Sequence, residues 1–394
     1  MKPAGYSGDP VDPAMPDEEP NRRADDAGEI VVAVCGDVMT GRGIDQILPH
    51  PCNPRIHEGY VASALDYVEL AEEANGPIAR PAAFSYIWGD ALAEFGRVGA
   101  DARIVNLETS ITRCEDYEAK GINYRMSPEN APCLAAAHVD CCVLANNHVL
   151  DWGRAGFEET LATLAANKLK SAGAGRNLDE AAAPAILDVA GKGRILVFGL
   201  GSATSGIPHD WRASDRQSGV NLLADFSERT VAEIAERVRR VKRPGDVVVA
   251  SIHWGGNWGY DISREEMRFA HGLIDQAAVD IVHGHSSHHA KAIEVHRGKP
   301  ILYGCGDFLN DYEGIRGYEE FRDDLALLYV VTLRISTGAL VRLEATPFRI
   351  RKFRLERASS EDATWLCDTL DREGARLGTG MALGDGNRLR LRWA

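Results

Sequence analysis

Several short apolar segments of this sequence end in side chains that bind metals or transfer protons. These end residues are, in chain order, Asp37, Glu108, Asn147 with His148, His253, His283 with His285, and Asp307. Any one of them could be an ordinary hydrogen-bonding group, but so many in equivalent places indicate a shared site. Carboxylates, an amide oxygen and imidazoles together suit Mn, Fe or Zn and, with enough oxygen ligands, Ca. We therefore predict a divalent metal ion held by Asp37, Glu108, Asn147, His253, His285 and His288.

The same segments contain residues suited to acid–base chemistry. His148 and Asp151 are three residues apart at a predicted strand-to-helix turn, and an Asp that orients a His makes a general base. Asp151 equally suits the N-cap of the helix that follows. His253 or His288 could pair with Asp307 in the same way. Two opposed pairs would remove a proton from one face of a carbon and return it to the other, so we predict His148, Asp151, His253 and Asp307 as catalytic residues.

Four further residues are candidates for substrate contact. Trp254, Trp258 and Tyr260 follow His253 closely and could line an aromatic pocket, with core packing as the alternative. Arg42 could clamp a carboxylate, with a solvated surface position as the alternative.

The elements that position these residues alternate between strands and helices. Apolar, β-branched runs predict strands at residues 30–35, 103–108, 141–145, 246–252, 279–282 and 300–303. Helical spacing of apolar residues predicts helices at 155–167, 227–241 and 265–278. This alternation predicts a layered α/β domain, in which ligands bind outside the carboxyl ends of the strands.

The chain is predicted to divide into a leader, one large domain and a closing segment. Residues 1–28 contain Pro, Asp, Glu and Gly and no continuous apolar run, and they are expected to be a disordered leader. Residues 29–356 form the metalloenzyme domain, in which 45–100 is long for a connection and is a candidate lid. Residues 322–356 alternate like antiparallel strands. In the closing segment, 357–394, a helix at 359–374 and a strand at 388–393 are expected to pack on the same domain.

Composition excludes several classes of protein. The formal net charge is -14 and the sequence has no basic run, which argues against a nucleic-acid partner. No stretch is long and apolar enough to span a bilayer, and no signal peptide is recognisable, so we expect no membrane association. The eight cysteines form no C-x-x-C pair and are expected to be free thiols, which predicts a cytoplasmic location.

The motifs occur in an order that resembles a known family. They are Gly36-Asp37-Val-Met, Asn106-Leu-Glu108-Thr, Asn146-Asn147-His148-x-x-Asp151, His253-Trp-Gly255, Gly284-His285-x-x-His288 and Tyr303-Gly-x-Gly-Asp307-Phe. Over residues 30–350 this set resembles the CapA family, named for poly-γ-glutamate capsule proteins and related to calcineurin-like metallophosphoesterases. The resemblance implies the calcineurin-like metallophosphatase fold, which is a β-sandwich flanked by α-helices with a metal site at the C-terminal ends of the strands.

Three departures from the phosphatase pattern bear on function. Met39 stands where calcineurin-like phosphatases have a His, Glu108 stands where they have an Asp that bridges two metals, and the spacing from His285 to His288 is one residue wider. Loss of that first His weakens the expectation of a second metal, on which two-metal phosphate hydrolysis depends.

Three functions remain open. The favoured one is a metal-dependent peptide epimerase that inverts an L residue to D in a ribosomally made peptide such as a lasso-peptide precursor, because the family resemblance extends to cytoplasmic epimerases of that kind. The second is a metallohydrolase of a phosphoester or a γ-glutamyl or other amide bond. The third is a non-catalytic protein that binds poly-γ-glutamate or a peptide.

Overall fold

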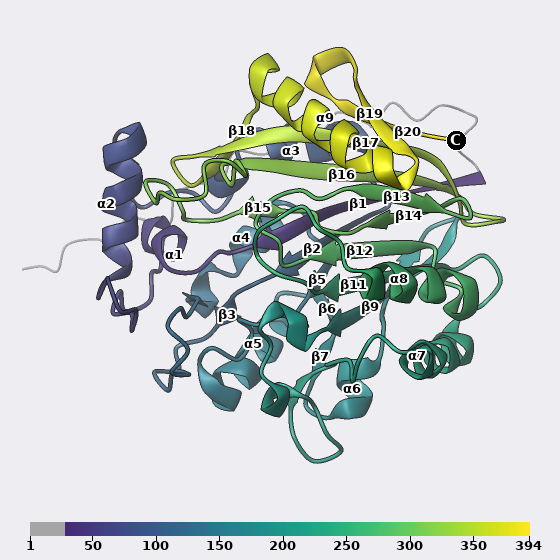
Figure 1. Cartoon of the computed structure of the whole chain (residues 1–394). Helices are drawn as coiled ribbons and strands as arrows, with labels where there is room; N and C mark the ends of the chain where they lie inside the picture. The colour runs from purple at the N-terminus through teal and green to yellow at the C-terminus, as the bar shows by residue number, and fades with distance from the viewer. Residues whose placement is uncertain (1–27) are drawn as a thin grey trace, which may run out of the picture.

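The computed structural model describes residues 28–394, in which two β-sheets pack face to face and helices cover their outer faces (Figure 1). The predicted α/β fold, a β-sandwich flanked by helices, is therefore confirmed. The expected disordered leader, residues 1–28, lies outside the described residues except for Gly28.

The larger sheet has ten strands, in the order β19-β20-β17-β16-β1-β2-β5-β6, with β15 beside β1 and β18 beside β17. Its strands are β1 (Glu29–Val38), β2 (Ala102–Leu107), β5 (Cys141–Val143), β6 (Lys170–Ala172), β15 (Asp307–Leu309), β16 (Leu325–Arg334), β17 (Ala339–Arg351), β18 (Arg354–Arg357), β19 (Thr379–Leu383) and β20 (Leu389–Trp393). The strands β1, β2, β5 and β6 run parallel, so their carboxyl ends meet at one edge.

The smaller sheet has six strands, in the order β13-β14-β12-β11-β9-β8. They are β8 (Ala185–Val189), β9 (Gly193–Gly201), β11 (Val247–His253), β12 (Ile281–His285), β13 (Ile293–His296) and β14 (Lys299–Leu302). The four central strands are parallel, and β8 and β13 close the sheet as antiparallel edges. Two short ribbons pair β3 (Ser110–Ile111) with β4 (Arg125–Met126) and β7 (Ala174–Gly175) with β10 (Gly219–Val220).

The helices lie mainly on the outer faces of the sandwich. They are α1 (Gly43–Ile47), α2 (Ala64–Asn75), α3 (Ala91–Val98), α4 (Pro132–Ala136), α5 (Gly153–Ala166), α6 (Leu178–Ala182), α7 (Glu228–Val241), α8 (Arg264–Ala277) and α9 (Ser360–Gly374), with single 3₁₀ turns at η2 (Tyr86–Trp88), η3 (Pro128–Asn130), η4 (Ala203–Ser205), η5 (His209–Trp211), η6 (Ala375–Leu377) and η7 (Asp385–Asn387). The helices α1 to α5 share a core with the larger sheet, and α7 and α8 share one with the smaller sheet.

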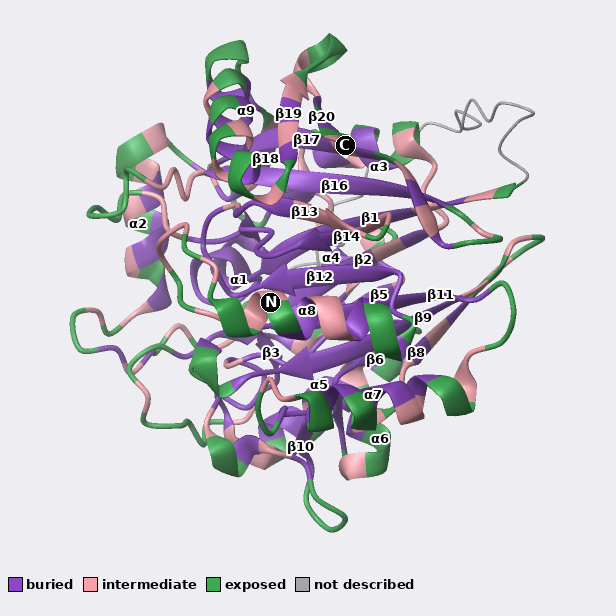
Figure 2. Ribbon diagram, turned by 45° about the vertical axis from the view of Figure 1, so that its right-hand side comes forward, coloured by how far each residue is buried: buried purple, intermediate pink, exposed green. Residues whose placement is uncertain are grey.

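The strand β1 is apolar on both faces because each face packs against a different core. Its alternate residues Ile30, Val32 and Val34 belong to the core between the two sheets, whereas Ala33 and Cys35 belong to the core beneath the helices. A strand covered on both faces reads as a continuous apolar run. Burial follows this arrangement, since the strands are buried and the outward faces of α7, α8 and α9 are exposed (Figure 2).

The predicted helices are confirmed to within two residues as α5, α7, α8 and α9. The start of α8 is set by a capping box in which Ser263 and Glu266 each accept a hydrogen bond from the other's backbone N–H. The strand β12 runs further than expected, so His283 and His285 lie within it rather than after it. The strands β8 and β9 were not anticipated.

The segment 45–100 is not a lid that stands free of the domain. Its second half packs into the core, where Trp88 and Phe95 are buried and the indole N–H of Trp88 donates to the carbonyl oxygen of Cys133 at 2.7 Å. The second half of the segment is therefore part of the core, and closure of the rest over the site stays a prediction.

Residues 357–394 add to the larger sheet. The strand β20 pairs antiparallel with both β17 and β19, and Leu366 and Leu370 of α9 pack against the core between the sheets. Among residues 28–394, no helix is long and apolar enough to cross a membrane.

Candidate metal centre

The two sheets bring their polar strand ends together at one edge of the sandwich. In the larger sheet, Asp37 of β1 is the register partner of Asp307 of the parallel strand β15. This close approach requires glycine, because a Cβ on Gly36 would lie 1.7 Å from the carbonyl oxygen of Gly306. In the smaller sheet, His253 and His285 are register partners at the ends of β11 and β12.

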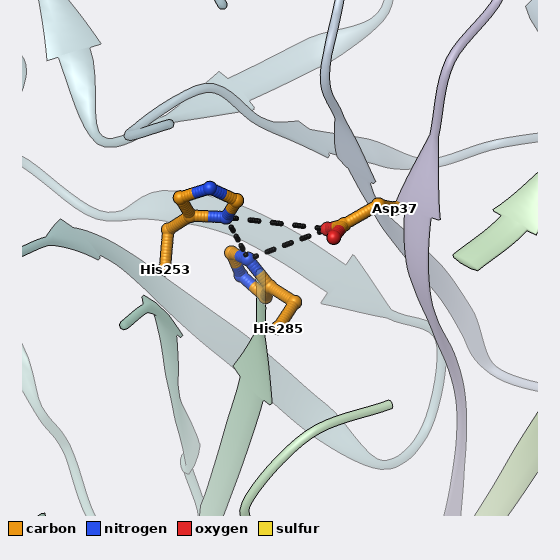
Figure 3. Close-up of side chains that lie close together, drawn as sticks. All are labelled: Asp37, His253 and His285. Carbon is orange, nitrogen blue, oxygen red and sulfur yellow. Dashed lines mark hydrogen bonds and ion pairs between the residues drawn. The ribbon is translucent and has the colours of Figure 1, made fainter. Parts of the chain in front are cut away.

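Asp37, His253 and His285 form the first group of candidate ligands, and all three are fully buried (Figure 3). The Oδ1 of Asp37 lies 3.7 Å from Nδ1 of His285 and 4.0 Å from Nδ1 of His253. The two Nδ1 atoms are 2.9 Å apart. The other oxygen of Asp37 accepts a hydrogen bond from the backbone N–H of Ser286 at 3.1 Å, and Asn106 donates to Oδ1 at 2.7 Å.

A chain of hydrogen bonds decides which nitrogen of His285 carries its proton. The Nε2 of His283 lies 2.9 Å from the carbonyl oxygen of Cys35, so it must be protonated, and burial keeps this ring neutral by lowering its pKa to about 4. Its Nδ1 therefore accepts from the hydroxyl of Ser251 at 2.9 Å. The Ser251 oxygen then accepts from Nε2–H of His285 at 2.9 Å, which leaves Nδ1 of His285 unprotonated.

His253 has one proton too few for its contacts. Its Nδ1 faces the unprotonated Nδ1 of His285 at 2.9 Å, and its Nε2 faces Oδ1 of Asn147 at 3.1 Å. Burial lowers the pKa of His253 well below its usual value, so the ring is neutral and has a single proton for two acceptors. One of these two contacts therefore has no hydrogen between its atoms. A cation bound between the two atoms of that contact would satisfy both of them. This donor set fits a divalent metal.

A second group of candidate ligands shares Asp37 with the first. It consists of Asp37, His288 and Asp307, whose ligand atoms lie within 4.8 Å of one another. The Nδ1 of His288 is 2.9 Å from Oδ1 of Asp307, and Asn310 donates to Oδ2 of Asp307 at 2.8 Å. Burial lowers the pKa of His288, but the charge and hydrogen bond of Asp307, together with the charges of Asp37 and Asp323, outweigh burial and leave the pKa raised.

The carboxyl groups between these histidines are crowded and short of partners. Burial, followed by the charge of Asp307, raises the pKa of Asp37 to about 7. Burial and the charge of Asp37 raise the pKa of Glu108 well above its usual value. One oxygen of Glu108, Oε2, is buried without any hydrogen-bond partner. Buried acids in this state are stabilised by a bound cation, which supports the same conclusion.

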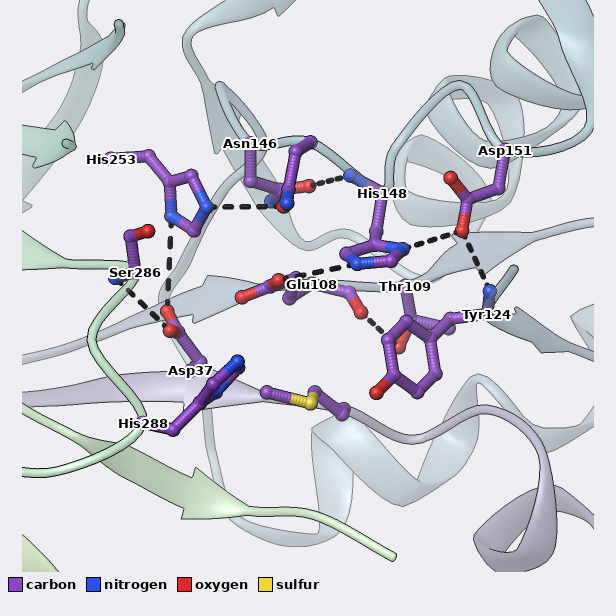
Figure 4. A network of polar contacts seen from close by, with 12 residues as sticks. Asp37, Glu108, Thr109, Tyr124, Asn146, His148, Asp151, His253, Ser286 and His288 are labelled. Carbon is purple, nitrogen blue, oxygen red and sulfur yellow. Dashed lines mark hydrogen bonds and ion pairs between the residues drawn. The ribbon is translucent and has the colours of Figure 1, made fainter. Parts of the chain in front are cut away.

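His148 and Asp151 form the pair that the sequence predicts, beside Glu108 (Figure 4). The Nδ1 of His148 is 2.7 Å from Oδ2 of Asp151, and its Nε2 is 3.7 Å from Oε1 of Glu108. Asp151 is not a helix cap, since the N-cap position of α5 is Trp152 and Asp151 instead accepts from the backbone N–H of Tyr124 at 2.7 Å. Burial lowers the pKa of His148 to about 4, against the opposing charge of Asp151.

Several residues of the site were missed by sequence reasoning. Ser251 and Asn106 lie within or beside the recognised motifs, and their positions on strands were the available signal. His283 was recognised as a strand-end residue, but its part in the hydrogen-bond chain was not. Lys120 gave no such signal, because it comes from an irregular loop. Its ammonium group lies 2.7 Å from Asp151 and 3.3 Å from Nδ1 of His148.

Arg42 is neither a substrate clamp nor a surface residue. It is 2% exposed, its guanidinium lies 2.5 Å from Asp311 and 2.9 Å from Glu58, and it stacks over the ring of Tyr67 at 4.0 Å. Two carboxylates already neutralise it, so the prediction that it clamps a substrate carboxylate is wrong.

The three predicted aromatic contacts separate in the structure. Trp254 is 3% exposed and donates from its indole nitrogen to the carbonyl oxygen of Tyr303 at 2.9 Å, so it packs in the core and the prediction of substrate contact is wrong there. Trp258 lies 5.2 Å from the ring of His288, measured between centroids, and is therefore beside the second ligand group. Tyr260 packs against the ring of His289, with the two ring centroids 4.6 Å apart, and so contacts the neighbour of His288 in the sequence.

The fold and the buried ligand groups define a two-sheet α/β protein with a candidate metal centre at the edge where the two sheets bring their polar residues together. Residues 31–312 match the family described as bacterial capsule synthesis protein PGA_cap, and the chain belongs to that family. The predicted resemblance to the CapA family is thereby confirmed.

Similar proteins agree with this assignment. The chain is 45% identical over 351 residues to a Mycobacterium tuberculosis protein named "Probable polyglutamine synthesis accessory protein", covering 89% of this chain and 92% of that protein. It is 28% identical over 249 residues to the PGA biosynthesis protein CapA of Bacillus subtilis, covering 63% of this chain and 61% of the relative. Among solved structures, a phosphatase from Mycoplasma pneumoniae aligns with a TM-score of 0.42 and 13% identity over 82% of this chain and 94% of that one, a likeness too low to bear on function.

Proposed function

We propose that this protein is a metal-dependent hydrolase that cleaves amide bonds in a polymer of glutamate or glutamine. The observation that supports this most directly is that Asp37 belongs to two buried ligand groups at once. A carboxylate shared between two cations about 3.5–4 Å apart is typical of two-metal hydrolytic sites. The departures in the sequence favour one metal, but the pair His288 and Asp307 supplies ligands for a second position.

The surrounding residues suit the proton transfers that amide hydrolysis needs. Bound divalent cations would activate a water and polarise the scissile carbonyl. His148 donates a hydrogen bond from Nδ1–H to Asp151, so its unprotonated Nε2 faces Glu108. This Nε2 can take a proton from the attacking water and pass it to the leaving amine. Burial keeps His148 neutral between turnovers, and the nearby charge of Lys120, which pairs with Asp151, acts in the same direction.

The substrate class rests on the names of the relatives. The Mycobacterium protein is named for polyglutamine synthesis and the Bacillus protein for PGA biosynthesis. An accessory protein of polymer synthesis that also has a hydrolytic site would trim or release the chain.

The test is to load the purified protein with Mn, Zn, Fe or Ca in separate samples and add γ-linked glutamate oligomers or polyglutamine peptides. We expect release of primary amines that is lost in Asp37→Asn and retained in Asp188→Asn, an exposed acid on β8. Release of phosphate from a phosphoester with no amine release would replace this proposal with a phosphoesterase. Binding of the oligomer without any turnover would leave a non-catalytic polymer-binding protein.

Peptide epimerisation is the second candidate, and a separate observation favours it. The site contains two histidine–carboxylate pairs, His148 with Asp151 and His288 with Asp307, at 2.7 and 2.9 Å. Two such pairs could remove and return a proton at a peptide Cα. Incorporation of deuterium at one Cα of an unbroken peptide in D₂O would support this reaction over hydrolysis.

A cytoplasmic location is also proposed. All eight cysteines are free, and six of them are buried. Free thiols persist best in a reducing compartment. Fractionation of the native host with an antibody to the chain would test this, and recovery in the medium or the envelope fraction would contradict it.

A further inference from the structure

A second cluster of histidines lies away from the candidate metal centre, on the outer side of the smaller sheet. His271 projects from α8, and Glu294 and His296 project from β13. Because alternate residues of a strand face the same side, Glu294 and His296 both face α8. His296 pairs with Lys299 at the start of β14, the end opposite to that of His285, so this cluster is separate from the candidate metal centre.

The cluster is held together by paired contacts. The Nε2 of His271 is 2.8 Å from Oε1 of Glu294, and the Nε2 of His296 is 3.0 Å from Oδ1 of Asp275, one turn further along α8. The two imidazole rings stack with centroids 3.9 Å apart and an angle of 7° between their planes. The remaining oxygen of Glu294 accepts from the hydroxyl of Tyr303 at 2.6 Å, which fixes that carboxylate.

We propose that His271, Glu294 and His296 form a second metal site, for a zinc-type divalent cation, that ties the edge strand β13 to α8. Their ligand atoms lie within 4.8 Å of one another. A tetrahedral zinc ion with bonds of about 2.0–2.1 Å needs about 3.4 Å between ligand atoms, so the side chains must rotate to turn both imidazole nitrogens toward one ion.

A fourth ligand and a structural role are both available. Asp275 already contacts His296 at 3.0 Å, and a metal bound by Asp275 would replace its ion pair with Arg297, also at 3.0 Å. The strand β13 is the last strand on its side of the sheet, and within residues 28–394 only β14 pairs with it. A cation that joins β13 to α8 would hold this edge in place. The site is independent of the proposed hydrolytic function.

The experiment uses the full chain with Asp37→Ala, which removes the ligand common to both groups of the candidate metal centre. After chelation, reloading with zinc and removal of free metal, we expect one zinc per chain. With Co²⁺ we expect the intense visible absorption of a tetrahedral site. Adding His296→Ala should weaken zinc binding at least about tenfold and abolish the zinc-induced rise in Tm.

The control is His209→Ala, an exposed histidine outside both sites, which should retain zinc and the rise in Tm. If His296→Ala leaves stoichiometry and Tm response unchanged, the cluster is only a pair of hydrogen-bonded histidines and the proposal is overturned. If Asp37→Ala does not fold, His271→Ala in the otherwise unaltered chain decides the matter, since it should lower the zinc content by one ion per chain and no change would refute the site.

Discussion

Asp37 and Asp307 are register partners on the neighbouring parallel strands β1 and β15, although 269 residues separate them in the chain. The backbone N–H of Asp37 donates to the carbonyl oxygen of Gly306 at 3.0 Å, which aligns the two strands. Asp37 can therefore belong to two ligand groups, whereas Asp307 belongs to one.

This relationship predicts different metal contents for two similar variants. Asp37→Asn should lose metal from both groups, because both depend on its carboxylate. Asp307→Asn should lose only the metal bound with His288. Elemental analysis of gel-filtered protein, with Asp188→Asn as a control, measures both. Equal losses in the two variants would show that Asp37 is not shared.

The hydrogen-bond chain through Ser251 predicts a loss of metal affinity without a ligand being touched. Ser251→Ala removes the acceptor for Nε2–H of His285, which frees His285 to protonate Nδ1 instead. Disrupting such a supporting hydrogen bond typically weakens metal binding about 10–100-fold. Titration calorimetry measures this, and Thr332→Val, which removes a buried hydroxyl on β16, is the control. Unchanged affinity in Ser251→Ala would mean that the chain does not set the tautomer.

The pair His148 and Asp151 predicts a loss of turnover with metal retained. His148→Gln removes the base but leaves Asp37, His253 and His285 in place, so kcat should fall about 10²–10⁴-fold. Metal content and KM should change little. Kinetics with the amide substrate and parallel elemental analysis separate the two effects. Loss of metal in His148→Gln would instead make His148 a ligand.

Substitution of Arg42 is expected to lower the stability of the fold rather than to weaken substrate binding. Arg42→Met would leave Glu58 and Asp311 buried without their counter-charge, which typically costs about 3–5 kcal/mol. Denaturant unfolding measures this cost. Arg229→Met, at an exposed helical ion pair, should cost less than about 1 kcal/mol. A rise in KM with unchanged stability would restore Arg42 as a substrate clamp.

Glu94, which is far from the metal centre, is expected to contribute to the stability of the fold in a pH-dependent way. Burial opposes ionisation of this carboxyl, but Arg97, Thr346 and Arg357 outweigh it and lower its pKa to about 2. A carboxyl with a lowered pKa stabilises the fold above its unfolded pKa of about 4.3, and this stabilisation is lost as the pH falls toward 2.

Glu94→Gln should therefore cost about 1–3 kcal/mol at pH 7, reduced because both arginines are partly exposed, and less at pH 3. Urea unfolding at the two pH values measures the difference. Glu236→Gln, at an exposed ion pair on α7, should show almost no effect at either pH. A cost for Glu94→Gln that does not change with pH would contradict the assignment.

The sequence by itself determined the elements and the types of residue at their ends. Helices such as α7 and α8 and strands such as β1 and β11 follow from local periodicity, because the spacing of apolar residues depends only on helix or strand geometry. The pair His148 and Asp151 was also recognisable, since three residues at a turn keep two side chains within reach.

Only the tertiary structure decided which of these residues meet. Asp307 reaches Asp37 because β15 lies beside β1, and Arg42 is neutralised by Asp311 from a distant loop. The tautomer of His285 depends on a hydrogen-bond chain that joins both sheets through His283. Such contacts depend on how sheets and loops pack over hundreds of residues, and local sequence patterns contain no information about that packing.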